Sequence, residues 1–479
     1  MSTLPNQLTS FPNLFYAILI LESVAKKLQM TLLDEAVSRY HKLLATPEHR
    51  ENGWLESLQE QMSARHLAPG GRPVCPVLRP HLITRRQYTS LVKASQTLYS
   101  AISRLNGLLQ ENAAMLSRME LFPAEKMLAG VDPGYAQLAV TTMLKTQVSN
   151  NSLLFAESYA NGAALTAQSD ALGEIFYDCA PVKQIRKKYK MSRPQGMKRL
   201  LHGLLTAYKG SGKKKFPRIA IVEFRAPIKG PGSDHLLLAE YLRQAGYPTE
   251  IVTPEQLEYR NGVLCRGDFG IEIVYRTISA QEFLVRFDLS HPLVRAYREN
   301  AVCVVNSFRT ELLQKKAIFG LLTDETVTGK FPAEERRVIR DHLPWTRLVT
   351  AAKTTYHNKT IDLPEFISAN REKLVLKPND PSTDMHSYEG KETDEAAWDK
   401  ALKTALRNPY VVQERVEPAR CDFPVLQFGK MEIRPMSVDV YPHLFLGKME
   451  TCSTQVGDLS STFSTLSGVA PTLILEGGK

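Results

Sequence analysis

The chain has 479 residues, of which 43% are hydrophobic and 23% are charged. These values are typical of a globular protein with two or three domains, and they exclude collagen-like, low-complexity and disordered chains. The net charge of +10 belongs to one segment, because 13 Lys and Arg residues and no Asp or Glu lie between Lys183 and Arg218, and the rest of the chain carries −3.

Residues 1–130 are predicted to be mainly helical. Apolar residues recur at helical spacing through Phe15–Leu32 and Tyr88–Leu109, and a Pro- and Gly-rich stretch separates the two blocks. The apolar run Phe11–Leu21 is about half as long as a membrane span, and no Lys or Arg precedes it. We therefore interpret it as a buried helix. The six cysteines are isolated, which predicts neither a zinc site nor a disulfide scaffold and favours the reducing cytoplasm.

The middle of the chain has the pattern of a β-α-β unit. Pro217–Phe224 is a predicted buried strand, Leu236–Ala245 is a helix that Ser233 or Asp234 can cap, and Thr249–Val252 is a second strand. This order predicts a parallel pair in an α/β layer. Further segments continue the pattern: a helix at Ala167–Phe176 and strands at Ile271–Tyr275 and Val302–Val305.

Three features of the last third suggest nucleotide binding. The predicted strand Leu374–Lys377 ends in a lysine, whose ammonium can meet phosphate oxygens. The predicted strand Tyr410–Glu414 runs into a polar hinge that can bind the edge of a base. Lys315 and Lys316 open a predicted helix at Ile318–Leu322. Taken singly, each feature has an ordinary alternative: a lysine at a solvated strand end, an edge strand with an exposed Glu, and a surface helix with solvated lysines.

A third strand of this part of the chain is predicted at Met436–Val440.

In order and spacing, these elements resemble the circularly permuted ATP-grasp family related to glutathionylspermidine synthase. The resemblance covers roughly residues 65–476 and rests on these segments: Arg72–Pro80, Phe155–Glu157, Ile273–Arg276, Cys303–Arg309, Pro344–Arg347, Leu376–Asp380, Val411–Val416 and Ala470–Thr472. It implies an α/β (α+β) fold of the circularly permuted ATP-grasp type. The mainly helical region at 1–130 would precede an α/β substrate domain (pre-ATP-grasp-like) at 131–305 and a nucleotide-binding-like domain at 306–479.

Ligases of this family use ATP and Mg²⁺ to turn a carboxylate into an acyl phosphate, which an amine then attacks. The resemblance makes Arg276 the candidate catalytic residue. By position it also implies a set of nucleotide-binding residues, with lysines at the phosphates and hinge residues at the adenine: Lys316, Lys377, Gln413, Glu414 and Val416.

The metal-binding positions differ from the family pattern. Where the family has Arg-x-Asp and then Glu-x-Asn, this chain reads Met-Leu-Lys at 143–145 and Glu-Ser-Tyr at 157–159. Lys145 and Tyr159 thus replace expected ligands, and the carboxylates of Glu157 and Asp439 remain. An ammonium about 4 Å from a unit positive charge costs about 4 kcal/mol at an effective dielectric constant of 20, which argues against Mg²⁺. We expect Lys145 to lie beside Glu157 and to pair with it.

The phosphate-binding residues of the family are changed as well. The stretch 381–389, where members have several glycines, contains none here. The late Arg and the Asn with its triple-glycine turn are replaced by Gln455, Phe463 and the segment Leu466–Gly468. The combined changes predict relaxed selection on catalysis.

We therefore favour a non-catalytic pseudo-ligase that acts through a protein partner, for which an active paralogue is the candidate, with ATP as the candidate cofactor. The first alternative is an active ATP-dependent carboxylate–amine ligase. The second is a polyanion- or nucleic-acid-binding protein that uses residues 183–218. There, thirteen positive charges would repel one another unless a partner screens them.

Overall fold

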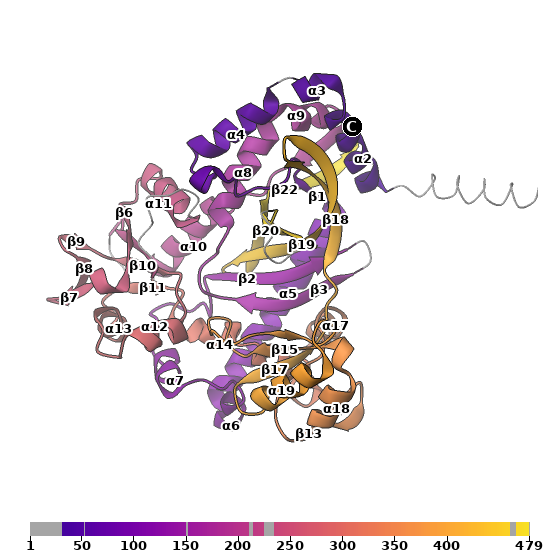
Figure 1. Ribbon diagram of the computed structural model, residues 1–479. Coiled ribbons are helices and arrows are strands. Elements are labelled where there is room, and N and C mark those ends of the chain that lie inside the picture. Colours follow the sequence, from indigo (N-terminus) through magenta and orange to yellow (C-terminus); the bar gives the residue numbers. More distant parts are fainter. Residues whose placement is uncertain are drawn as a thin grey trace, which may run out of the picture.

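The computed structural model describes residues 31–51, 53–149, 152–209, 214–224, 234–459 and 466–478, which form a mixed arrangement of helices and sheets (Figure 1). The predicted helix at Phe11–Leu21, the predicted helical block Phe15–Leu32 except its last two residues, and the candidate residues Ser233 and Phe463 lie outside these ranges. Within them, no helix combines the length and the apolar character needed to cross a membrane.

The N-terminal part of the described chain is mainly helical, as its spacing predicts. A capping box fixes the start of its longest helix, because the Thr84 side chain accepts from the Gln87 N–H while the Gln87 side chain accepts from the Thr84 N–H. This helix packs its buried face on the strands β19 (Lys430–Phe445) and β20 (Lys448–Asp458) and also contacts α15 (Ala317–Leu322) and α17 (Ala333–His342). The helices are α2 (Leu32–Leu44), α3 (Pro47–Glu51), α4 (Trp54–Ala64), α5 (Arg85–Glu111), α6 (Ala113–Ser117) and α7 (Pro123–Ala129).

The predicted β-α-β unit is confirmed. A four-stranded parallel sheet has the order β11-β10-β5-β6 and consists of β5 (Ile219–Val222), β6 (Thr249–Val252), β10 (Ile273–Arg276) and β11 (Cys303–Val305). Helix α11 (Asp234–Gln244) leads to Gly246, whose φ of +91° suits a glycine after a helix end. Residues 166–298 also contain α8 (Thr166–Asp178), α9 (Ala180–Arg186), β4 (Tyr189–Ser192), α10 (Met197–Lys209), β7 (Glu258–Arg260), β8 (Val263–Arg266), β9 (Phe269–Gly270), α12 (Ala280–Arg286) and α13 (Pro292–Arg298).

The predicted strand Met436–Val440 lies within β19 (Lys430–Phe445), and the other two predicted strands of the last third belong to a second sheet. It is antiparallel, with the order β12-β17-β15-β16, and consists of β12 (Thr346–Leu348), β17 (Tyr410–Glu414), β15 (Leu374–Pro378) and β16 (Tyr388–Glu389). Trp345 and Trp398 belong to the apolar core of this lobe. Its other elements are α14 (Glu311–Gln314), α15 (Ala317–Leu322), α16 (Glu325–Thr328), α17 (Ala333–His342), β13 (Lys353–Tyr356), β14 (Lys359–Asp362), α18 (Leu363–Ala369) and α19 (Glu395–Ala405).

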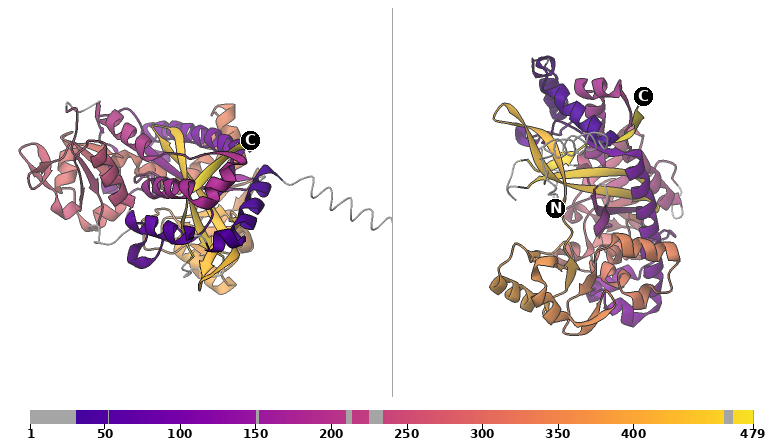
Figure 2. Two further views of the ribbon diagram at one scale, coloured as in Figure 1. Left: turned by 90° about the horizontal axis from the view of Figure 1, so that it is seen from above. Right: turned by 90° about the vertical axis from the view of Figure 1, so that its right-hand side faces the viewer.

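The central sheet joins early and late parts of the chain. It has the order β21-β20-β19-β2-β3, with β18 paired to β19, and consists of β2 (Thr141–Val148), β3 (Leu153–Tyr159), β18 (Ala419–Gln427), β19 (Lys430–Phe445), β20 (Lys448–Asp458) and β21 (Gly468–Ala470). A further small sheet has the order β1-β22-β4, with β1 (His81–Thr84) and β22 (Thr472–Gly478). The lobe with β15 and β17 lies below the central sheet (Figures 1 and 2).

Candidate nucleotide and metal site

Side chains from two sheets meet at one place. Within the central sheet, Lys145 of β2 lies opposite Glu157 of β3, and β19 with Asp439 runs along the other side of β2. Lys377 reaches Glu157 from β15 in the lower lobe. The structure therefore brings together the predicted phosphate-binding lysine and the predicted metal ligands.

Two lysine–carboxylate pairs are found among these residues. Lys377 Nζ lies 3.1 Å from Glu157 Oε1, and Lys145 Nζ lies 3.4 Å from Asp439 Oδ2. The predicted ion pair between Lys145 and Glu157 is therefore wrong, although the two residues lie opposite each other as expected. The difference comes from tertiary packing. Lys377, on a strand of the other sheet, pairs with Glu157, and Lys145 pairs with Asp439 on the opposite side of β2.

Glu157 is surrounded by positive charge. Burial by itself would raise the pKa of its carboxyl group. The ammonium groups of Lys377, Lys316 and Lys145 outweigh burial and, together with a hydrogen bond from the Tyr159 hydroxyl, lower the pKa of Glu157 to about 2. Tyr159, which stands where the family pattern has a metal ligand, thus helps to hold Glu157 ionised.

Lys316 lies beside this cluster with its ammonium group unused. Its backbone N–H donates to the carbonyl of Asn379, but among the described residues its Nζ has neither a hydrogen bond nor an ion pair. Burial lowers the pKa of Lys316, and the charge of Lys377 adds to this effect. A partly desolvated ammonium without an acceptor is suited to a phosphate oxygen.

The side chain of Gln413 is tied to both sheets. Its Oε1 accepts a hydrogen bond of 3.0 Å from Lys377 Nζ, and its Nε2 donates to Thr346 Oγ1 at 3.1 Å within the antiparallel sheet and to the Ala156 carbonyl of β3 at 3.4 Å. Gln413 is 2% exposed, so its side chain orients Lys377 instead of facing solvent.

The rest of the predicted hinge combines a structural carboxylate with a free backbone donor. Glu414 accepts hydrogen bonds from the Trp345 N–H and from the Tyr356 hydroxyl. The N–H of Val416 has no acceptor within the described part of the chain. An adenine edge would therefore meet the backbone of the hinge, while the Glu414 side chain serves the fold.

The loop after β15 is held by side chains in place of glycines. Asn379 Oδ1 accepts from the Ala317 N–H at 2.8 Å, and Asp380 Oδ2 lies 2.6 Å from Lys315 Nζ. Every residue of α15 is buried, which excludes the alternative of a solvated surface helix.

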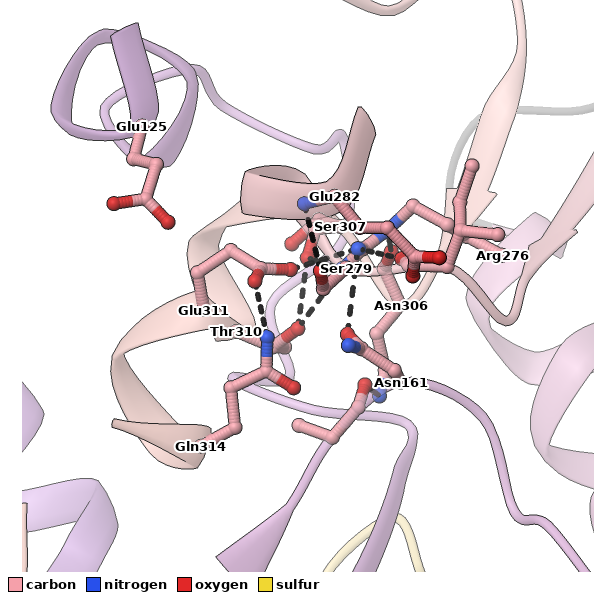
Figure 3. Close-up of polar contacts among 12 residues, drawn as sticks. Glu125, Asn161, Arg276, Ser279, Glu282, Asn306, Ser307, Thr310, Glu311 and Gln314 are labelled. Carbon is pink, nitrogen blue, oxygen red and sulfur yellow. Dashed lines mark hydrogen bonds and ion pairs between the residues drawn. The ribbon is translucent and has the colours of Figure 1, made fainter. Parts of the chain in front are cut away.

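Arg276 is engaged by the protein itself. Its side chain and that of Glu311 are both 0% exposed, and Arg276 Nη1 lies 2.7 Å from Glu311 Oε1 (Figure 3). The guanidinium also donates to the carbonyls of Asn306 and Ser307. This arrangement gives Arg276 a structural role, and its catalytic role stays a prediction.

The residues present do not fit a Mg²⁺ site of the family type. Magnesium requires several oxygen ligands in near-octahedral geometry. Here each remaining carboxylate, Glu157 and Asp439, is paired with an ammonium group that a dication would have to displace. No group of three His, Cys, Asp or Glu side chains that could hold a metal occurs within the described ranges.

Sequence reasoning missed Gln147, which completes the environment of Asp439. Its Nε2 donates to Asp439 Oδ1, and its Oε1 accepts from the Ala419 N–H at 2.6 Å. Gln147 follows Lys145 by two residues on β2, so strand periodicity was a usable signal.

The basic segment is spread over several elements and is partly neutralised from within. Its ion pairs are Lys188–Glu35 (2.5 Å), Arg193–Glu174 (3.0 Å), Arg199–Glu450 (3.4 Å), Lys214–Glu272 (2.5 Å) and Arg218–Glu272 (3.3 Å). The sequence predicts that these positive charges need a binding partner to neutralise them. For these five side chains the prediction is wrong, because acidic residues from other parts of the chain form ion pairs with them. Binding of a polyanion stays a prediction.

No family model and no curated protein matches this chain. The structure is similar to the apo form of a glutathione synthetase-like effector (GSS30) from Globodera pallida, with 12% identity, a TM-score of 0.57, and coverage of 89% of this chain and 97% of that one. A looser match is a putative gamma-glutamylcysteine synthetase from Methylobacillus flagellatus, with 10% identity, a TM-score of 0.39, and coverage of 82% of this chain and 87% of that one. Another is the ATP-grasp ligase PsnB complexed with a minimal precursor, with 12% identity, a TM-score of 0.29, and coverage of 55% of this chain and 90% of that one.

The likeness to the glutathione synthetase-like effector shows the fold. The chain has a mixed α/β, ATP-grasp-like fold, as the sequence resemblance implied. Because a fold hosts many functions, the activity has to be argued from the site.

Proposed function

We propose that this protein is a non-catalytic relative of ATP-grasp carboxylate–amine ligases, which binds a nucleotide without Mg²⁺ and acts through a protein partner. The observation that carries the proposal is the pair of contacts Lys377–Glu157 and Lys145–Asp439, at 3.1 and 3.4 Å. Both carboxylates that remain from the family's metal site are already neutralised by the chain.

The loss of catalysis follows from the charge that develops during phosphoryl transfer. Forming an acyl phosphate moves negative charge onto oxygens that a metal ion normally stabilises. Lys145 and Lys377 supply charge in the same region, but each is held by a carboxylate and neither bridges two phosphate oxygens as an octahedral dication does. The arrangement favours binding over turnover.

The affinity for a nucleotide follows from the remaining donors. Three ammonium groups, those of Lys145, Lys316 and Lys377, lie around two carboxylates, which leaves one positive charge in excess. Lys316 has no protein partner among the described residues, and the Val416 N–H is free at the hinge. These donors suit phosphate oxygens and an adenine edge without a metal ion.

Thermal unfolding with ATP tests this proposal. We expect ATP to raise the Tm equally in EDTA and in Mg²⁺, and we expect no release of ADP or AMP above background with amino acids or polyamines. Lys316→Ala should abolish the ATP-dependent shift. Lys373→Ala is the matched control, because Lys373 is an exposed lysine outside the cluster. Mg²⁺-dependent release of ADP or AMP that Lys377→Ala abolishes would instead establish an active ligase.

A gain-of-metal variant gives a second test. Lys145→Asp removes an ammonium and places a third carboxylate next to Glu157 and Asp439, as the family pattern requires. We expect Mg²⁺ to raise the Tm of this variant and to leave that of the parent unchanged. An equal response of the two proteins to Mg²⁺ would contradict the role given to Lys145.

The proposed partner rests on the contrast between the retained fold and the altered site. A chain that keeps a large apolar core while its reactive positions change must be useful through its surface. An active ligase of the same fold is the candidate partner, and co-purification with such a paralogue followed by an activity assay of the mixture tests it.

A further inference from the structure

A cavity of about 550 Å³, which none of the lysines and carboxylates of the candidate site line, lies between α2, β1 and the start of β18. Apolar side chains that include Leu33, Val37 and Val148 line part of its wall, and Arg79 lies on another part. Its volume falls within the range of small-molecule sites in proteins, about 300–1,000 Å³.

Arg79 is a buried cation whose hydrogen bonds are incomplete. Its side chain is 2% exposed, and its Nη1 and Nη2 donate to the carbonyls of Pro80 and Asp422 at 2.8 and 2.7 Å. Its Nε–H has no acceptor, and among the described residues no carboxylate forms an ion pair with it, although the Asp422 carboxylate is near enough to favour its charged form. The Phe423 ring, 4.2 Å from the guanidinium carbon, contacts one face of the group.

Arg276 provides a comparison inside the same chain. It is buried to the same degree, but its guanidinium lies 2.7 Å from the Glu311 carboxylate. Burying an unpaired charge costs several kcal/mol, so buried arginines normally have an acidic partner. Among the described residues Arg79 lacks this partner, and it faces a cavity, which points to an anionic ligand as the missing partner.

Other groups around the cavity support an anionic ligand. His41 Nε2 is buried without a hydrogen-bond partner, and Lys42 and Arg420 also line the cavity. Two acidic residues, Asp34 and Asp422, line it too, but the Asp34 carboxylate already accepts from the N–H and the hydroxyl of Thr31. The charged lining therefore has one positive charge in excess.

We propose that this cavity binds a small carboxylate that carries a short apolar chain. The planar guanidinium of Arg79 still has donors for a carboxylate, and the apolar wall that includes Leu33 and Val37 suits an aliphatic chain. A ligand of this class completes the polar contacts of Arg79 and fills the apolar part of the cavity.

Calorimetric titration of the full chain with hexanoate tests the proposal. Acetate, the neutral isostere hexanamide and inorganic phosphate are the comparison ligands. We expect hexanoate to bind more tightly than all three, because only hexanoate combines a carboxylate with an apolar chain. Both Arg79→Met, which removes the cation, and Val37→Phe, which fills the apolar part, should weaken hexanoate binding by at least about 30-fold.

Arg39→Ala is the matched control, because Arg39 is an exposed arginine on α2 that does not line the cavity. Hexanoate should bind this variant as it binds the parent. Should Arg79→Met fail to fold, Val37→Phe decides, since it leaves Arg79 in place. The proposal is overturned if hexanoate does not bind the parent, if hexanamide or phosphate binds as tightly, or if Val37→Phe binds hexanoate unchanged.

Discussion

At the scale of single residues, Glu157 shows how neighbouring side chains determine the role of a carboxylate. A carboxylate at this position in the family would hold a metal ion, whereas here it accepts from Lys377 and Tyr159. Carboxylate oxygens can bind either a metal ion or an ammonium group, and the lysines on neighbouring strands determine which of the two Glu157 binds. The identity of Glu157 therefore says less about function than the identities of Lys145 and Lys377.

The lowered pKa of Glu157 predicts a specific acid sensitivity. Its pKa falls from 4.5 in the unfolded chain to about 2 in the folded protein, so the unfolded state binds more protons between these values. The stabilisation is fully present above about pH 4.5 and is lost as the pH falls toward 2. We expect Glu157→Gln to lose on the order of 3 kcal/mol of unfolding free energy at pH 7, and this difference should shrink as the pH falls from 4.5.

Urea unfolding at pH 7 and at pH 3 measures this difference. Asp439→Asn is the control at the neighbouring ion pair, because it removes a carboxylate of the same cluster without touching Glu157. If the parent and Glu157→Gln lose stability in parallel on acidification, the stabilisation assigned to Glu157 is wrong.

At the scale of elements, the basic segment divides into structural and free cations. On α9 and just after it, Arg186 stacks over Tyr177 at 3.5 Å and Lys188 pairs with Glu35 of α2. Lys183 and Lys187 are exposed and have no ion pair among the described residues. Any binding of a polyanion at this place therefore depends on Lys183 and Lys187.

Charge reversal on α9 separates these roles. We expect Lys183→Glu with Lys187→Glu to weaken binding of duplex DNA at low salt, with the Tm nearly unchanged, because exposed charges contribute little to stability. Lys188→Glu is the control that places a second negative charge beside Glu35, and because this pair is exposed it should lower the Tm only slightly. Salt-dependent filter binding measures the affinity. If the double variant binds DNA as the parent does, α9 is only a solvated face.

At the scale of the whole molecule, a buried ion cluster joins three distant segments. Lys315 Nζ lies 2.9 Å from Glu125 of α7 and 2.6 Å from Asp380 of the loop after β15. Lys315 and Glu125 are 1% and 0% exposed. Burial alone would lower the pKa of Lys315, but the two carboxylates raise it, so the residue stays charged. The cluster holds the lobe with β15 and β17 against the N-terminal helices.

Removing this cation should weaken the assembly of the lobes. We expect Lys315→Met to reduce the free energy of unfolding by about 3–5 kcal/mol, because it leaves two buried carboxylates without their partner. Lys93→Met is the matched control, since Lys93 and Glu334 form an exposed pair at 3.8 Å and should contribute less than about 1 kcal/mol. Calorimetry at pH 7 compares the variants. Equal losses in the two variants would contradict the role of the cluster.

Much of the local structure was determined by the sequence alone. Apolar runs such as Ile219–Val222 and Tyr410–Glu414 became strands, the helical spacing of 88–109 became α5, and Gly246 ended α11. These features depend on neighbours a few residues away, so periodicity and capping suffice to predict them. The ATP-grasp-like fold followed from the order of the motifs, and circular permutation stays a prediction.

The partners within the site were decided only by the tertiary structure. Lys145, Glu157, Lys377 and Asp439 lie on four strands of two sheets, and no local pattern tells which ammonium reaches which carboxylate. An ion pair depends on distances of 3 to 4 Å between side chains that are far apart in the chain, so a single lysine from β15 was enough to change the pairing. Sequence identified the groups, and the packing of the lobes chose their contacts.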